Sequence, residues 1–388
     1  MAEVAMLVSN RHDPDPRVQK EAAALVVAGH EVRVYAFDRQ HELEPVVEVI
    51  DGVEVERIQL ANKVPYGGLL STARGIRAFH RMVKSRLIDR PADVVHCHDQ
   101  DTCAVGLWWQ RLGRGRFVFD AHDLYWTWLL LPAPRSLLRR AGARVLKRRD
   151  SRYAAAADML IVGTGGQGGF AGFRELYRAI GVEPIVVMNA EEEVHDIPAP
   201  PERFTIGFFG GVRDLPMFEN LVEAVMGIDE PLRPRLRIAG AGTAYDEVSR
   251  LLAKAALDGL DHTISGRFSS KDMPVLMREC SIQYCVYSTE RGNIANTIPA
   301  KLFTSLAYNR RVIVNEDCLT GHLTESNRWG WCVPDGRAEP LRELLERLAG
   351  EWERVREAEI PWGSFGDPPL WSEQAGILTK AYIDLLNR

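Results

Sequence analysis

The chain has 388 residues, of which 46% are hydrophobic, and this length and composition predict two domains with separate cores. Its formal net charge is -5 at pH 7, whereas a general nucleic-acid binder carries an excess of positive charge. No DNA or RNA partner is therefore expected. The six cysteines show neither CxxC spacing nor nearby histidine pairs, which argues against a disulfide framework and against a metal site.

The N-terminal sequence, MAEVAMLVSN, lacks the basic segment and the apolar length of a signal peptide. No apolar run approaches the roughly 20 residues of a membrane span. We therefore expect a cytoplasmic protein that is either soluble or peripheral at the inner membrane face.

The chain opens with a strand–helix–strand pattern, predicted over residues 4–9, 17–28 and 31–37. Arg17 stands in the first turn of this helix, toward the crevice where ligands of such sheets bind. Two interpretations remain open for its side chain. It either contacts an anion or substrate on the acceptor side, or it is a structural helix arginine that is solvated or pairs with Asp13.

Two strands further along the chain end in histidine and aspartate. They contain the sequences DVVHCH and RFVFDAH, at residues 93–98 and 116–122. Parallel strands place their carboxyl ends at one edge of a sheet, so these side chains are expected to share one crevice. A functional and a structural interpretation both remain open for the residues concerned, which are His98, Asp99, Asp120, His122 and Asp123.

Two basic helices are also predicted in this half of the chain. The helix over residues 74–90 is interpreted as a surface helix. Residues 125–157 combine an aromatic and leucine patch, YWTWLLL, with an arginine-rich helix. Such segments bind anionic lipid surfaces, but the same pattern also fits a helix packed on a sheet with its charges in water. Peripheral membrane contact is therefore one of two interpretations.

The first domain is predicted to cover residues 1–190. A strand over residues 158–162 precedes GTGGQGG, a weak phosphate-loop pattern without the spacing of a P-loop or a dinucleotide fold. A last strand follows at residues 183–189. The acidic, proline-rich residues 190–202 are interpreted as a semi-rigid linker.

Strand–helix alternation restarts in a second domain, predicted over residues 203–365. Two of its strands end at glycines: Gly210 and Gly211 follow one, and Gly240 follows the next. Glycines at strand ends let a ligand approach the backbone. Arg213 lies close enough to the first pair to meet a phosphate.

The strongest candidate site is the strand–loop–helix–strand unit at residues 284–315, YCVYSTERGNIANTIPAKLFTSLAYNRRVIVN. A helix that begins beside a strand end directs unpaired N–H groups and a positive dipole end into the crevice. The amides of Ala300 and Lys301, with the Lys301 ammonium, suit a diphosphate, while Asn296 and Thr297 suit hydroxyl groups. A Pro-Ala-Lys helix start is also common without a phosphate, so the site stays a hypothesis.

Together these motifs resemble the GT-B glycosyltransferases, in particular the retaining family 4 (glycosyl transferases group 1). The anchors are DPRVQKEAAALVVAGHEV, ADVVHCHDQDT, FVFDAHDLY, IGFFGG, LRIAGAGTAYDEV and HTISGRFSSKDMPVLMREC. The resemblance implies an α/β fold of two Rossmann-like domains, each with a doubly wound parallel sheet, facing a cleft. It also implies that the N-terminal domain holds the acceptor, that the C-terminal domain holds a nucleotide sugar, and that residues 366–388 return to the N-terminal domain.

Carried over by residue, the resemblance implies three groups of site residues. Orienting or polarising groups would be His98, Asp99 and His122, and acceptor-side residues would be Arg17 and Asp123. The donor would contact Gly210, Gly211, Arg213, Gly240, Arg267, Asn296, Thr297, Ala300, Lys301 and Thr304. The implied reaction transfers a sugar with retention, from a UDP- or GDP-sugar to a small molecule or glycan, without metal or cofactor. A homo-oligomer remains open.

The chain departs from the family pattern at the donor site. The family's Glu-x7-Glu element falls on residues 296–304, where Asn296 and Thr304 replace both glutamates. Charge-assisted hydrogen bonds to the ribose, of about 1.5–3 kcal/mol each, are thereby exchanged for weaker ones. Pro216 and Met217 stand about where a lysine is expected, which leaves less positive charge for the leaving diphosphate.

Three interpretations of function follow. We prefer an active transferase. The alternatives are a degenerate GT-B scaffold that binds a partner or ligand without turnover, and an enzyme of natural-product biosynthesis that performs a pseudo-glycosyl coupling with an unusual donor.

Overall fold

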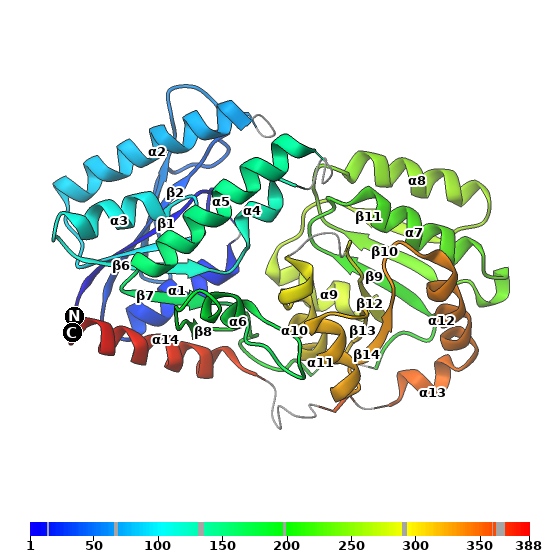
Figure 1. Ribbon diagram of the computed structural model, residues 1–388. Helices are drawn as coiled ribbons and strands as arrows, with labels where there is room; N and C mark the ends of the chain where they lie inside the picture. Colours follow the sequence, from blue (N-terminus) through cyan, green and yellow to red (C-terminus); the bar gives the residue numbers. More distant parts are fainter. Residues whose placement is uncertain are drawn as a thin grey trace. The chain divides into compact units, whose positions relative to one another are not determined.

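Two units make up the structure, which is a computed structural model describing residues 1–13, 15–65, 69–130, 136–196, 199–288, 293–358, 360–361 and 369–388. Unit 1 comprises Met1–Gly166, Ala171–Asn189 and Trp371–Arg388, and unit 2 comprises Gln167–Phe170 and Ala190–Leu370 (Figure 1). Residues 371–388 thus belong with the N-terminal unit, and residues 190–196 belong with the C-terminal one.

Unit 1 is built on a sheet that has eight strands among the described residues, in the order β3-β4-β2-β1-β5-β6-β7-β8. β3 and β4 pair antiparallel, and the other neighbouring pairs among the described strands are parallel. Its elements are β1 (Glu3–Val8), α1 (Pro16–Val27), β2 (Glu31–Phe37), β3 (Val47–Ile50), β4 (Val53–Ile58), α2 (Leu69–Asp89), β5 (Val94–His98), α3 (Cys103–Arg111), β6 (Arg116–Ala121), α4 (Tyr125–Trp128), α5 (Leu137–Ala156), β7 (Met159–Val162), α6 (Phe173–Arg178), β8 (Ile185–Val186) and α14 (Trp371–Leu386).

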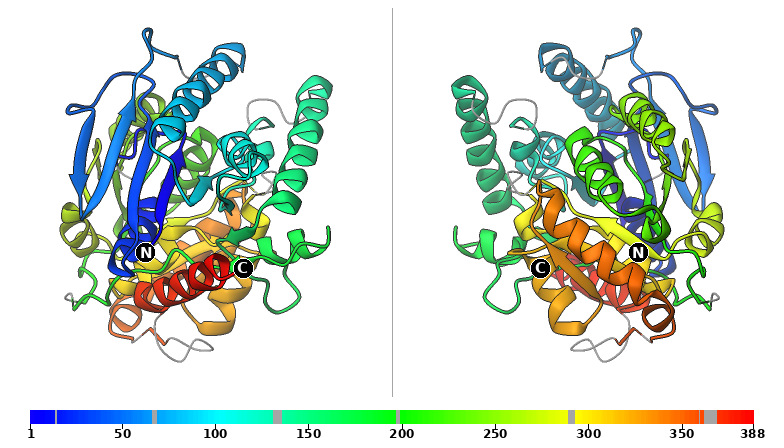
Figure 2. Two further views of the ribbon diagram at one scale, coloured as in Figure 1. Left: turned by 90° about the vertical axis from the view of Figure 1, so that its left-hand side faces the viewer. Right: turned by 90° about the vertical axis from the view of Figure 1, so that its right-hand side faces the viewer.

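Side chains of β1 alternate between two cores, as strand geometry requires. Ala5 and Leu7 pack in a core that includes residues of α2, α3 and α6. Val4 and Met6 pack in a second core, to which α1 and α14 contribute. α14, the last helix of the chain, lies against α1 on this face of unit 1 (Figure 2). Helices therefore cover both faces of the sheet.

Unit 2 has a parallel sheet with six strands among the described residues, in the order β11-β10-β9-β12-β13-β14. Its elements are β9 (Thr205–Phe209), α7 (Leu215–Met226), η1 (Glu230–Leu232), β10 (Arg235–Ala239), α8 (Tyr245–Leu257), β11 (His262–Ser265), η2 (Ser270–Asp272), α9 (Met273–Arg278), β12 (Ile282–Cys285), η3 (Ile294–Asn296), α10 (Ala300–Ala307), β13 (Arg311–Asn315), α11 (Leu319–Asn327), β14 (Gly330–Val333), α12 (Ala338–Gly350) and α13 (Trp352–Arg356).

The cores of unit 2 also lie on both faces of its sheet. Phe208 and Ile238 pack in a large core with residues of α7, α8 and α12. Their neighbours Phe209 and Ala239 point the other way, into a smaller core with residues of α9. The structure therefore confirms the predicted α/β class with two doubly wound, largely parallel sheets.

Candidate functional site

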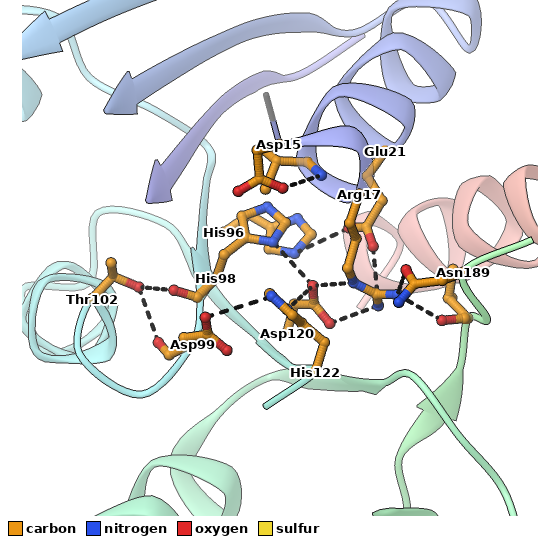
Figure 3. Close-up of polar contacts among 12 residues, drawn as sticks. Asp15, Arg17, Glu21, His96, His98, Asp99, Thr102, Asp120, His122 and Asn189 are labelled. Carbon is orange, nitrogen blue, oxygen red and sulfur yellow. Dashed lines mark hydrogen bonds and ion pairs between the residues drawn. The ribbon is translucent and has the colours of Figure 1, made fainter. Parts of the chain in front are cut away.

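The carboxylate of Asp120 is the centre of a polar cluster in unit 1 (Figure 3). Asp120 and His98 pair in register near the carboxyl ends of β6 and β5, and Asp120 is fully buried. Arg17 Nε and Nη2 donate to the two carboxylate oxygens at 2.8 Å each. The Nδ1 atoms of His98 and His122 each lie 3.0 Å from Asp120 Oδ2. Although burial alone would raise it, Arg17 and His122 hold the pKa of Asp120 well below its usual range.

Arg17 fits neither of the two interpretations that the sequence left open. The residue is only 7% exposed, so it is not a solvated arginine. Besides Asp120, its guanidinium contacts Glu21 Oε1 at 3.1 Å and donates to Val187 O at 2.9 Å and Asn189 Oδ1 at 3.0 Å. These contacts engage its donors inside unit 1. Arg17 therefore neutralises two buried carboxylates and positions Asp120, rather than presenting a charge to an acceptor.

The two histidines differ in what their Nε2 atoms meet. His98 is 2% exposed, and its Nε2 has no hydrogen-bond partner among the described residues. His122 Nε2 lies 3.5 Å from Asp99 Oδ2. Although burial lowers it, the Asp99 and Asp120 carboxylates raise the pKa of His122 to about 10. His122 is therefore cationic at neutral pH, with a carboxylate beside each ring nitrogen, whereas the Nε2 atom of His98 is buried without such a partner among the described residues.

Asp99 and Asp123, two further predicted residues, lie just beyond the strand ends. Asp99 has a left-handed backbone with φ +61°, and its N–H donates to Asp120 O at 2.9 Å. This turn brings the Asp99 carboxylate beside His122. Asp123 is half-buried, and its carbonyl accepts from Tyr125 N at 3.0 Å at the start of α4.

A metal ion can be considered at four of these buried side chains. Glu21, His96, His98 and Asp120 offer ligand atoms that all lie within 4.8 Å of one another. The guanidinium of Arg17, however, already contacts both carboxylates. A divalent cation there would lie beside this fixed positive charge, which disfavours its binding.

In unit 2, the loops after β9 and β10 approach so closely that only glycine fits. Gly210 and Gly240 have φ values of +143° and +148°. A Cβ on Gly240 would lie 1.8 Å from Gly210 O, and a Cβ on Gly210 would lie 2.6 Å from Lys301 Cε. The structure thus brings together three of the predicted donor-site residues. Gly211 lies beside Arg213, because a Cβ at Gly211 would be 3.2 Å from Arg213 Nε.

Lys301 is a cation with aromatic rather than acidic neighbours. Its Nζ lies 3.4 Å from the centroid of the Phe208 ring and 5.5 Å from that of Tyr287, and no carboxylate pairs with it among the residues that the structure describes. Burial lowers its pKa to about 8, and the charge of Arg213 acts in the same direction. A desolvated cation without a counter-ion is costly, so an anion beside Lys301 would be stabilising.

The start of α10 lies next to this lysine. Pro299 is the residue before the helix, with extended backbone, and none of the described side chains caps the first turn. The N–H groups of Ala300 and Lys301 are consequently available for an anion.

The remaining predicted donor-site residues lie just before α10, within it, or just after β11. Asn296 ends the short helix η3, and Thr297 O accepts from Thr320 Oγ1 at 2.9 Å. Thr304 Oγ1 donates to the carboxylate of Glu191. Arg267 is exposed just beyond Gly266, whose carbonyl accepts from Gly240 N at 3.0 Å.

Two carboxylates in these sites were not among the predicted residues. Glu21 is fully buried beside Arg17, and burial together with Asp120 raises its pKa to about 7. The spacing of Arg17 and Glu21, four residues apart on one helix, was the available signal. Glu191 lies in the stretch interpreted as a linker, and nothing in its local sequence marks it as part of a site.

Comparison with known proteins agrees with the resemblance. A sequence model of the glycosyl transferase 4-like domain matches residues 14–188. No curated protein matches the sequence at a significant level. In the part of the chain that the structure describes, every helix is too short or too polar to cross a lipid bilayer.

Solved structures with a similar fold cover nearly the whole chain. Sucrose-phosphate synthase from Thermosynechococcus elongatus has a TM-score of 0.75 at 16% identity, over 99% of both chains. The Anabaena protein HepE in complex with UDP-glucose has a TM-score of 0.67 at 15% identity, over 100% of both chains. The catalytic domain of starch synthase IV from Arabidopsis thaliana, bound to ADP and acarbose, has a TM-score of 0.64 at 12% identity, also over 100% of both chains. The chain therefore shares the fold of these proteins, and its residues 14–188 are similar to the glycosyl transferase 4-like domain.

Proposed function

We propose that the protein transfers a sugar from a nucleoside-diphosphate donor, such as a UDP- or GDP-sugar, to a hydroxyl or amine of an acceptor, with retention. The observation that supports this most directly is the Lys301 ammonium, which lies between the glycine loops and the start of α10 without an acidic partner among the described residues. HepE, a protein of the same fold, was crystallised with UDP-glucose.

The same groups suit the chemistry of the leaving diphosphate. When the bond between the sugar and the diphosphate breaks, negative charge develops on the phosphate oxygens. Lys301 and the first amides of α10 are positive groups positioned before that charge forms, and such preorganisation is an effective source of rate. The exposed Arg213 adds positive charge near Lys301. We propose that they stabilise the leaving group without a metal ion.

Unit 1 would orient the acceptor. Asp120 binds the Nδ1 side of His98, so the buried Nε2 atom of that ring is directed away from the carboxylate and would hydrogen-bond an acceptor group that enters beside it. The cationic His122, held between Asp99 and Asp120, would add positive charge beside this group. Retention needs no protein nucleophile if the acceptor attacks the sugar on the face from which the diphosphate leaves, so these residues orient and polarise.

A specific observation also favours the scaffold interpretation, since Asn296 and Thr304 replace the two family glutamates.

A titration distinguishes the two functions. UDP, GDP, ADP and dTDP are titrated calorimetrically into the wild type, Lys301→Met and, as a matched control, Lys271→Met on the exposed surface of η2.

We expect micromolar binding of one nucleotide, weakened about tenfold (roughly 1.4 kcal/mol) by Lys301→Met and unchanged by Lys271→Met. The nucleotide that binds then identifies which sugar donors to assay for release of diphosphate. Absence of nucleotide binding, or binding without turnover of any donor, would support the scaffold instead. A pseudo-glycosyl coupling would appear as turnover with an unusual donor.

We also propose peripheral contact with an anionic membrane surface, through the N-terminal part of α5. Leu137 and Leu138 are 79% and 82% exposed there. Arginines and lysines follow along the exposed surface of the helix, and its one acidic residue, Asp150, is buried and accepts a hydrogen bond from Tyr177. Exposed leucines beside a row of cations are typical of helices that bind lipid surfaces.

A further inference from the structure

The segment after Asn189 is part of the candidate donor site in unit 2. Glu191 accepts a hydrogen bond from Thr304 Oγ1, in the second turn of α10. It also forms a parallel β-bridge with Leu370. Glu191 is therefore held at the surface of unit 2 and is only partly exposed, unlike a residue in a solvated linker.

The next residues of the segment secure this position. His195 N donates to Ala307 O at 2.8 Å, at the C-terminal end of α10. The His195 ring stacks on that of Tyr308, with the centroids 3.9 Å apart and the planes 18° from parallel. The segment thus lies along α10, with contacts at Thr304, Ala307 and Tyr308.

The Glu191 carboxylate lies one helical turn from the proposed diphosphate site. Lys301 and Thr304 are three residues apart on α10, so their side chains are neighbours on one face, separated by about 4.5 Å along the axis. Both are partly exposed, whereas Leu302 and Phe303 between them are buried. The ribose of a nucleoside diphosphate is bonded directly to its first phosphate. A diphosphate at Lys301 therefore brings the ribose within reach of Thr304 and its partner Glu191.

The chemistry of the pair suits the ribose diol. The two hydroxyls of a ribose are donors, and an ionised carboxylate is an acceptor with two oxygens and about four lone-pair sites. Thr304 gives its own proton to Glu191, and a carboxylate can accept from several donors at once. Thr304 alone has one hydroxyl and no charge, so it cannot replace a glutamate at its position.

From this geometry we propose that Glu191 supplies the carboxylate that binds the ribose hydroxyls of the donor, in place of the glutamate that residue 304 lacks. The inference rests on the proposed nucleotide-dependent function. It makes the acidic segment at residues 190–196 a determinant of specificity for ribonucleotides over 2′-deoxyribonucleotides.

The test combines a change in the protein with a change in the ligand. UDP, GDP and ADP, each with its 2′-deoxy counterpart, are titrated into the wild type, Glu191→Gln and the control Glu192→Gln. Glu192 is the exposed neighbouring carboxylate, so its variant loses the same charge from the same segment. We expect Glu191→Gln to weaken the ribonucleotide about tenfold and the 2′-deoxy analogue less than twofold. Glu192→Gln should change neither.

The outcomes separate this inference from the proposed function. If no nucleotide binds the wild type, the proposed function fails and the inference fails with it. If the wild type prefers the ribonucleotide but Glu191→Gln weakens both ligands equally, or neither, then Glu191 only packs on α10 and the inference alone is overturned.

A second variant keeps the test informative if Glu191→Gln disturbs the segment. Thr304→Glu in the Glu191→Gln background returns a carboxylate to the same face of α10. We expect it to restore the preference for the ribonucleotide to within about threefold of the wild type. The opposite outcome is a double variant that keeps an unchanged thermal unfolding midpoint and still shows no preference for the ribonucleotide. That result would contradict a ribose-binding carboxylate at this place.

Discussion

Arg17 and Asp120 form a buried, bidentate ion pair, with both hydrogen bonds at 2.8 Å, although 103 residues separate them in the sequence. The pair joins α1 to the end of β6 inside unit 1, where the side chain of Arg17 is 6% exposed and that of Asp120 is fully buried. Everything that the cluster does chemically depends on Asp120 remaining ionised, because its carboxylate holds both histidines.

Removing the arginine should therefore destabilise the fold. Arg17→Met leaves the buried carboxylates of Asp120 and Glu21 without their cation, so we expect the free energy of unfolding to fall by about 3–5 kcal/mol. Urea denaturation monitored by circular dichroism measures it. The control is Arg77→Met on the exposed face of α2, expected to change stability by less than about 0.5 kcal/mol. Equal effects of the two variants would show that the buried pair contributes nothing.

The charge of His122 predicts a dependence of stability on pH. The folded-state pKa of about 10 lies above the ordinary value of 6.5, so protonated His122 stabilises the fold fully below pH 6.5. This contribution is lost as the pH rises from 6.5 to 10. The difference in unfolding free energy between wild type and His122→Asn should shrink over that window. A difference that stays constant between pH 6.5 and 10 would mean that the imidazole is not held in its charged form.

His98 should affect turnover more than binding. Its Nε2 is the ring nitrogen proposed to bind the acceptor, so His98→Asn should lower kcat about 10²-fold with the donor that the wild type uses. Nucleotide affinity, which depends on unit 2, should change less than twofold. His322→Asn, in α11, provides a matched histidine control. If kcat is unchanged, His98 is a structural ligand of Asp120 alone.

Gly240 should tolerate no side chain. In Gly240→Ala the new Cβ would lie 1.8 Å from Gly210 O, at a φ of +148° that L-residues rarely adopt. We expect a loss of more than about 2 kcal/mol in unfolding free energy, together with weaker nucleotide binding. The control is Gly376→Ala in α14, where nothing lies within 4 Å of the added Cβ and a helical alanine should stabilise by up to about 1 kcal/mol.

If α5 contacts the membrane, removing its exposed leucines should reduce binding of the protein to lipid vesicles. The double variant Leu137→Ser, Leu138→Ser should sediment with vesicles containing anionic lipid at least about fivefold less than the wild type. The control Leu257→Ser removes a leucine that is 86% exposed on α8 of unit 2. Equal sedimentation of all three proteins, or wild-type binding to purely zwitterionic vesicles, would contradict an electrostatically assisted contact.

Local sequence patterns were enough to predict the alternation of strands and helices that the structure contains. Apolar runs in the sequence correspond to β1, β5 and β6, and Asp15 accepts from Val18 N at 3.3 Å at the start of α1. The glycines after β9 were also visible as sites of close backbone approach.

Other elements were not predicted, for physical reasons that can be named. The β3–β4 hairpin lies at the sheet edge, where β3 is half exposed and lacks a continuous apolar run. α3 contains Gly106, which reduces helix propensity but is needed because a Cβ there would lie 2.3 Å from Phe117 Cδ2.

The sequence by itself determined the α/β class, the family resemblance and most residues of the two candidate sites, because each of these is expressed in short-range spacing and residue type. Only the tertiary structure decided the roles of Arg17 and Glu191. Their partners, Asp120 and Thr304, are 103 and 113 residues away, and a charged side chain in a helix turn or an acidic segment looks the same whether it meets water or a distant buried group.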